Sequence, residues 1–165
     1  MVEVQLAAVR VDLQSKMPVV LLQERNGAKR TLPIFIGPPE ATAIAFALQG
    51  VVTERPLTHD LIRDMLTAFG ARLERVVVTE LRGSTYYAEI HADLGGRQYT
   101  VSSRPSDAIA IAVRLGTPLF VADELLDAEG VILQADEDED DAETPEDLVD
   151  QFREFIQGIR PEDFS

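Results

Sequence analysis

The sequence contains no cysteine and no tryptophan, and it has only two histidines among its 165 residues. The absence of cysteine excludes disulfides, thiolate-bound zinc, iron–sulfur clusters and thiol catalysis. Two histidines are too few for a multi-histidine metal site. The N-terminus has neither a basic start nor a long apolar run, and no apolar stretch reaches the length of a membrane span. We therefore expect a cytoplasmic protein with no membrane association.

Hydrophobic residues make up 45% of the chain, which is enough for a packed core and excludes wholesale disorder. The length predicts one domain, with an appendage at most. The net charge of −14 and a pI near 4.4 argue against a simple basic nucleic-acid binder.

The negative charge is concentrated at the C-terminal end. Residues 1–134 hold 13 Lys and Arg against 16 Asp and Glu, whereas residues 135–165 hold 2 against 13. We therefore predict a nearly neutral domain over 1–134, followed by a solvated acidic linker over 135–143. As a hypothesis, this acidic region competes with nucleic acid for the arginines of the domain.

The segment 144–165 is predicted to be an amphipathic helix and tail. Thr144 is suited to cap the helix, and Pro145 to its first position. A single helical stripe follows, formed by Leu148, Phe152, Phe155 and Ile159. Such a stripe needs an apolar partner, which we expect to be the domain itself or a sister subunit.

Alternating patterns and turn residues predict an α+β domain with a mixed, largely antiparallel sheet and packed helices, built from two roughly similar strand–helix halves. The strands are expected at 2–13, 18–24, 31–36, 73–81, 86–93, 98–102 and 119–121. The helices are expected at 40–49, 58–69, 106–115 and 123–128. In the second helix Thr58 is the expected N-cap, and the expected buried face consists of Leu61, Ile62, Met65, Leu66 and Phe69.

Two predicted helix starts resemble one another. Residues 32–45 and 99–112 align without gaps, so that Glu40 matches Asp107 in the first helical turn. One interpretation is that both acids simply favour a helix N-terminus. The other is that the two carboxylates meet, either to bind Mg²⁺ or Mn²⁺ through oxygen ligands or to act in acid–base chemistry.

Charged residues near these helix starts extend the candidate site. Helical spacing places three charged residues close to one line, namely Arg104, Asp107 and Arg114. One interpretation is a salt-bridge cluster that fixes the helix. The other is a metal-binding carboxylate flanked by phosphate-binding arginines. His59 and Asp60 lie at another predicted helix start. His59 is interpreted either as a surface histidine with no role or as a general base or metal ligand that acts with Asp60.

Several motifs together resemble the bifunctional nuclease domain family of bacteria and plants. They lie at residues 32–37 (LPIFIG) with 40–45 (EATAIA), 55–61 (RPLTHDL), 86–88 (YYA), 104–110 (RPSDAIA), 118–121 (PLFV), 152–155 (FREF) and 161–164 (PEDF). The resemblance covers almost the whole chain.

The resemblance implies an α+β nuclease that hydrolyses DNA and RNA, assisted by a divalent cation, and that self-associates as a homo-oligomer. It points to Glu40, Arg55, His59, Asp60, Arg104, Ser106 and Asp107. We expect Glu40, Asp107 and Asp60 to hold the metal, with His59 acting as base. Arg55, Arg104 and Arg114 are expected to bind phosphate, with Ser106 in support.

Two other functions stay open. The same charged residues are compatible with a non-catalytic regulatory or scaffold domain, in which they form a salt-bridge network at an oligomer interface. Alternatively, the helix starts bind a small anion or a nucleotide.

Overall fold

A computed structural model describes residues 1–133. The predicted acidic linker (135–143) and C-terminal helix (144–165) lie outside the described residues. Within them, no helix has the length and apolar character needed to cross a membrane.

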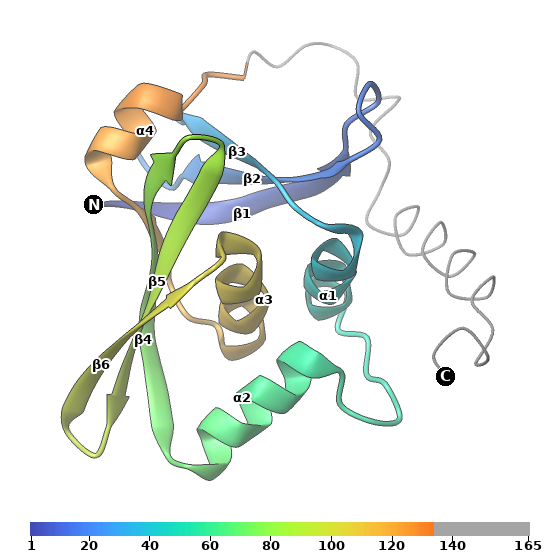
Figure 1. Ribbon diagram of the computed structural model, residues 1–165, viewed down its shortest axis with the longest axis vertical. Helices are drawn as coiled ribbons and strands as arrows, with labels where there is room; N and C mark the ends of the chain where they lie inside the picture. Colours follow the sequence, from blue (N-terminus) through green and yellow to red (C-terminus); the bar gives the residue numbers. More distant parts are fainter. Residues whose placement is uncertain (134–165) are drawn as a thin grey trace.

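Over residues 1–133 the fold is α+β, as predicted, with one seven-stranded mixed sheet and four helices (Figure 1). In chain order the elements are β1 (Val2–Val11), β2 (Pro18–Glu24), β3 (Thr31–Phe35), α1 (Pro38–Leu48), α2 (Thr58–Ala68), β4 (Ala71–Arg82), β5 (Thr85–Leu94), β6 (Arg97–Ser103), α3 (Pro105–Leu115), β7 (Leu119–Val121) and α4 (Asp123–Glu129).

The sheet has the order β3-β2-β1-β7-β4-β5-β6. It therefore consists of two antiparallel three-stranded units, joined through the short strand β7. This strand pairs antiparallel with β1 and parallel with β4. The similarity of the two halves beyond this strand order stays a prediction.

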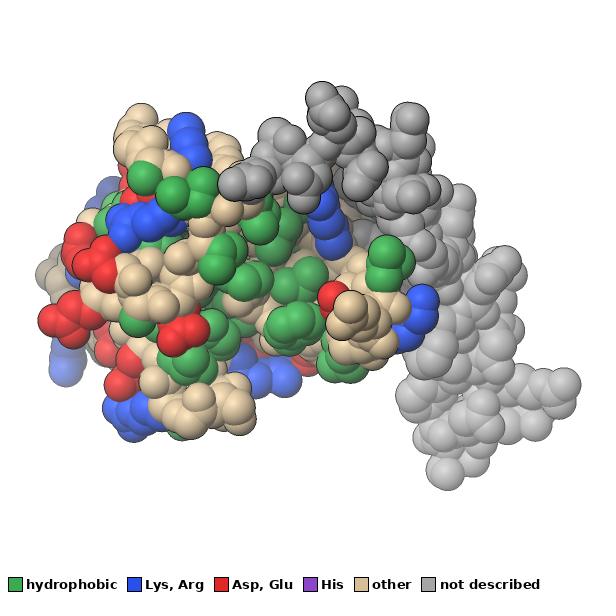
Figure 2. Space-filling view, turned by 90° about the horizontal axis from the view of Figure 1, so that it is seen from above, with side chains coloured by type: hydrophobic (Ala, Val, Ile, Leu, Met, Phe, Trp, Pro, Cys, Tyr) green, Lys and Arg blue, Asp and Glu red, His purple; other side chains and the backbone are tan. Residues whose placement is uncertain are grey.

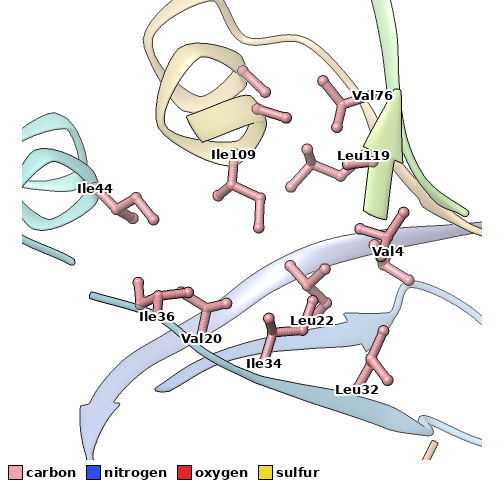
Figure 3. Close-up of a cluster of buried hydrophobic side chains, with 14 of the residues drawn as sticks. Val4, Val20, Leu22, Leu32, Ile34, Ile36, Ile44, Val76, Ile109 and Leu119 are labelled. Carbon is pink, nitrogen blue, oxygen red and sulfur yellow. The ribbon is translucent and has the colours of Figure 1, made fainter. Parts of the chain in front are cut away.

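The core lies between the sheet and the helices α1 and α3. Alternation along β2 and β3 sends Val20, Leu22 and Ile34 to the inner face, where all three are almost completely buried. Figure 3 shows Ile44 of α1 and Ile109 of α3 pointing toward these strands. The alanines of α3, among them Ala108, Ala110 and Ala112, are fully buried and allow the helix to lie close to its neighbours.

Helix α2 differs most from the sequence prediction. The expected buried face is largely open, because Leu61 is 49% exposed, Met65 47% and Phe69 67%. The helix touches α3 and β4 but lies beyond the layer formed by α1 and α3 (Figure 1), so little of the described part of the chain is available to cover its apolar stripe. The prediction of Thr58 as N-cap is also wrong, since Leu57 is the N-cap.

Candidate active site

The starts of three helices meet at one group of charged side chains. These are Glu40 in the first turn of α1, His59 in the first turn of α2, and Arg104 and Asp107 at the start of α3. We call these four residues the helix-start cluster. The chain places them at these positions because Pro38 and Pro105 each open a helix directly after a strand.

Arg104 links the two carboxylates of the helix-start cluster. Its Nη2 donates to Glu40 Oε1 at 2.9 Å, and its Nε donates to Asp107 Oδ2 at 2.7 Å. The two matched helix starts are therefore close together, with Arg104 between their carboxylates. The Arg104 side chain is 66% exposed, whereas that of Glu40 is only 14% exposed. The guanidinium thus faces solvent while both of its acidic partners are held beneath it.

Asp107 also contacts His59. His59 Nε2 lies 2.9 Å from Asp107 Oδ1, and the imidazole is largely buried, with 11% of the side chain exposed. Burial alone raises the pKa of Asp107, but the hydrogen bonds from Arg104 and His59 outweigh it and hold that pKa below its ordinary value. Asp107 is therefore ionised at neutral pH and can orient the histidine ring.

Asp60 and Arg114 form a separate ion pair between α2 and α3. Arg114 Nε donates to Asp60 Oδ1 at 2.7 Å, and Arg114 Nη1 donates to the carbonyl of Ala110 at 2.8 Å. The other Asp60 oxygen accepts the Leu57 backbone N–H at 3.1 Å, which caps α2. Burial raises the pKa of Asp60, but hydrogen bonding to Arg114 and to the backbone outweighs it and lowers that pKa.

This ion pair bears on two sequence predictions. Arg114 is only 4% exposed and pairs with Asp60, so its predicted contact with a phosphate has no open surface in this structure and stays a prediction. The two oxygens of Asp60 accept from Arg114 and from the Leu57 backbone, and the predicted part of Asp60 in a metal site stays a prediction. The spacing predicted that Arg114 lies on the same helical line as Asp107, but Arg114 pairs with Asp60 of α2.

The two remaining predicted residues differ in accessibility. Arg55 is exposed in the loop that precedes α2 and is open to a ligand. Ser106 is buried in the first turn of α3, with 6% exposed, next to Arg104 and Asp107 along the chain. A small cavity of about 170 Å³ lies beside α2 and is lined by Thr53, Pro56, Asp60, Arg63 and other residues of the loop and helix.

The comparison with protein families gives a match at this point. The sequence profile of the bifunctional nuclease domain covers residues 20–134, which include the whole helix-start cluster and the Asp60–Arg114 pair. The chain belongs to the bifunctional nuclease domain family.

Individual relatives fall into two groups. The uncharacterized protein Rv1829 of Mycobacterium tuberculosis is 45% identical over 164 residues, which cover 98% of this chain and 97% of the relative. Bifunctional nuclease 2 of Arabidopsis thaliana is 30% identical over 115 residues, and the rice protein of the same name is 27% identical over 117 residues. These alignments cover 68% and 69% of this chain but only 35% and 36% of the plant proteins.

In this member of the bifunctional nuclease domain family, the side chains predicted to hold a divalent cation do not converge on a common point within residues 1–133. Among residues 1–133, no three His, Asp or Glu side chains converge in an arrangement that could hold a metal ion. Between Glu40 and Asp107, where the sequence predicts the cation, the structure has the Arg104 guanidinium bonded to both. The donor set as arranged therefore does not fit a bound Mg²⁺ or Mn²⁺.

Sequence reasoning missed the part that Gly37 plays in the site of this bifunctional nuclease domain. A Cβ atom at Gly37 would lie 2.3 Å from Glu40 Oε2, so only glycine leaves room for the carboxylate to fold back over the start of α1. The backbone φ of Gly37 is −75°, which any residue can adopt. The requirement is therefore one of space, which no local sequence pattern indicates.

Proposed function

We propose that this chain is a nuclease that hydrolyses phosphodiester bonds of DNA and RNA at the helix-start cluster. The observation that carries the proposal is the hydrogen-bonded series Glu40–Arg104–Asp107–His59, which joins three helix starts and leaves one guanidinium open to solvent. The family match supports the same activity, because the plant relatives carry the name bifunctional nuclease.

Arg104 is the residue that we assign to phosphate binding. A guanidinium is charged at every relevant pH and offers a planar set of donors that matches two phosphate oxygens. Glu40 and Asp107 hold it in a fixed orientation, and its exposure of 66% leaves it accessible to a polynucleotide. A phosphate at Arg104 also places the scissile bond next to Asp107 and His59. Exposed Arg55 is a second candidate for the backbone of the substrate.

His59 and Asp107 are assigned to proton transfer. When Nε2 carries the proton and donates to Asp107, the lone pair is on Nδ1. This nitrogen can then accept a proton from an attacking water as the new oxygen–phosphorus bond forms. The ionised Asp107 carboxylate stabilises the imidazolium that results. The imidazolium then gives the proton to the leaving ester oxygen as the scissile phosphorus–oxygen bond breaks, so the products are a phosphate monoester and a free hydroxyl.

The test compares cleavage of single-stranded DNA and of RNA by the purified full-length protein and its variants. General acid–base groups contribute about 10²- to 10⁴-fold, so Asp107→Asn and His59→Gln are expected to lose at least about 100-fold in rate. Arg72→Gln is the matched control, because Arg72 is 76% exposed and lies on β4, outside the cluster. Parallel reactions with Mg²⁺, with Mn²⁺ and with a chelator decide whether cleavage depends on a metal. Wild-type rates in a folded Asp107→Asn variant would refute the assignment.

A scaffold function is the second candidate, and one observation favours it. Both carboxylates of the cluster are paired with Arg104, which is the pattern of a network that fixes helices in place. On this hypothesis Asp107→Asn lowers the melting temperature strongly, no preparation cleaves nucleic acid above a contamination control, and light scattering detects an oligomer. Cleavage that disappears with Asp107→Asn while the melt is unchanged favours the nuclease.

A further inference from the structure

The outer face of the β1–β2–β3 unit is apolar although no helix among residues 1–133 covers it. Cross-strand pairing places Ala8 beside Leu21 and Pro33, and it places Val19 beside Phe35, on the face opposite the core. Phe35 is 58% exposed, Ala8, Leu21 and Pro33 are half-buried, and Val19 is buried. Figure 2 looks onto this side of the molecule and shows hydrophobic side chains gathered in its middle. We call Ala8, Val19, Leu21, Pro33 and Phe35 the outer patch.

We propose that the segment 144–160 of the same chain docks on the outer patch through its apolar stripe. The stripe is formed by Leu148, Phe152, Phe155 and Ile159, which recur at helical spacing. An apolar face of this kind requires an apolar partner. This inference is independent of the nuclease proposal.

The path of the chain supports docking within one molecule. Val131 exchanges two backbone hydrogen bonds with Thr31 at the edge strand β3, so the chain leaves the domain beside the outer patch. An extended chain advances about 3.3–3.6 Å per residue, so residues 134–147 can reach roughly 45 Å, which is more than the length of β1. A tether of this length also gives a high effective concentration, which favours the patch of the same chain over that of a second copy.

Charge complementarity favours the same occupant. Residues 1–36, which contain the outer patch, hold five Lys and Arg against three Asp and Glu, and the segment 135–165 holds 13 acids against two bases. A second exposed apolar surface, on α2, suits an acidic partner less well, because that helix carries two aspartates and one arginine.

The alignments with relatives show that the segment 144–160 lies outside the family domain. The family profile ends at residue 134, before the segment begins. The alignment with the mycobacterial protein extends over 164 residues and so includes the segment. The docking is therefore proposed as an addition to the family domain that this chain and that relative have in common.

The experiment uses the absence of cysteine, which allows a single spin label to be placed at Gln151→Cys in the full-length protein. In spectra of ¹⁵N-labelled protein, we expect the amide signals of Leu21 and Phe35 to be lost when the label is paramagnetic and to return when it is reduced. The charged substitution Phe35→Glu, or Phe152→Glu in the segment, is expected to restore both signals. The same spectra report whether each variant is folded.

Phe69→Glu is the matched control, since Phe69 is 67% exposed, against 58% for Phe35, but lies after α2. It is expected to leave the loss of signal unchanged. Loss of signals from α2 instead of the outer patch, or no loss at all, overturns the proposal. In a mixture of spin-labelled ¹⁴N protein with unlabelled ¹⁵N protein, docking within one molecule leaves the signals of Leu21 and Phe35 unchanged. Loss of these signals in the mixture identifies a second copy as the occupant and also overturns the proposal.

Discussion

Replacing Asp60 by asparagine isolates the charge of the buried Asp60–Arg114 pair. The asparagine oxygen can still accept the Leu57 N–H, so the cap of α2 is kept while the guanidinium of Arg114 loses its counter-ion. Arg114 is 4% exposed and Asp60 is 20% exposed. Breaking a buried pair costs about 3–5 kcal/mol, and the partial exposure of Asp60 places the expected loss near about 3 kcal/mol. For a chain of this size that corresponds to a decrease in melting temperature of roughly 6–12 °C.

The assay is chemical denaturation followed by circular dichroism at pH 7. Arg63→Gln is the control, because Arg63 lies 3.9 Å from the same carboxylate but is 38% exposed. A surface pair of this kind contributes below about 1 kcal/mol. Adding Arg114→Met to Asp60→Asn removes the unpaired guanidinium and is expected to recover part of the lost stability. If Asp60→Asn is no more destabilising than Arg63→Gln, the structural role of Asp60 is refuted.

The pH dependence gives a second check on the same pair. The pKa of Asp60 is lowered in the folded protein, so its contribution to stability is complete above the unfolded pKa of about 3.9 and is lost as the pH falls through the folded pKa. The difference in unfolding free energy between wild type and Asp60→Asn is therefore expected to be constant from pH 7 to pH 5 and to shrink below about pH 4. A difference that persists unchanged at low pH would contradict this.

Three further predictions address the site, the core and the acidic segment. Gly37→Ala should displace the Glu40 carboxylate and reduce nuclease activity while the melting temperature stays nearly constant, and an unchanged rate would argue against a part for Glu40. Ile109→Ala should lower the free energy of unfolding by about 2–5 kcal/mol in urea denaturation, because Ile109 is fully buried, and a smaller loss would mean that the core closes around the cavity. Deletion of 135–165 should strengthen binding of single-stranded DNA at low salt, measured by fluorescence anisotropy, and an unchanged affinity would discard competition by the acidic segment.

Local patterns in the sequence were sufficient to predict the class of the fold and most of its elements. Alternation identified β2 and β3, and the connection between them contains Asn26-Gly27, a pair typical of hairpin turns, in which Gly27 adopts a φ of 83°. The spacing of three residues between Arg104 and Asp107 correctly predicted that these side chains are neighbours on a helix. All of these features depend on residues close together in the chain.

Features that depend on contacts between residues far apart in the chain could not be predicted from the sequence. The pattern of α2 shows which side is apolar but not what it packs against, and Phe69 is therefore 67% exposed instead of buried. The partner of Arg114 comes from α2, whereas its spacing suggested a common role with Asp107. The bond of Arg104 to Glu40 connects residues 64 positions apart, and it fills the place predicted for a metal.

The three residues of β7 also determine when the sheet can form. Strand β7 (Leu119–Val121) joins two units that have no direct pairing in the strand order, and it comes after both of them in the chain. Each three-stranded unit can form from local contacts, but their union requires pairing of Val2 with Val121. This pairing closes a very long loop and is entropically costly, so we expect it to be late in folding. During synthesis the two units remain separate sheets with open edges at β1 and β4 until residue 121 has emerged from the ribosome.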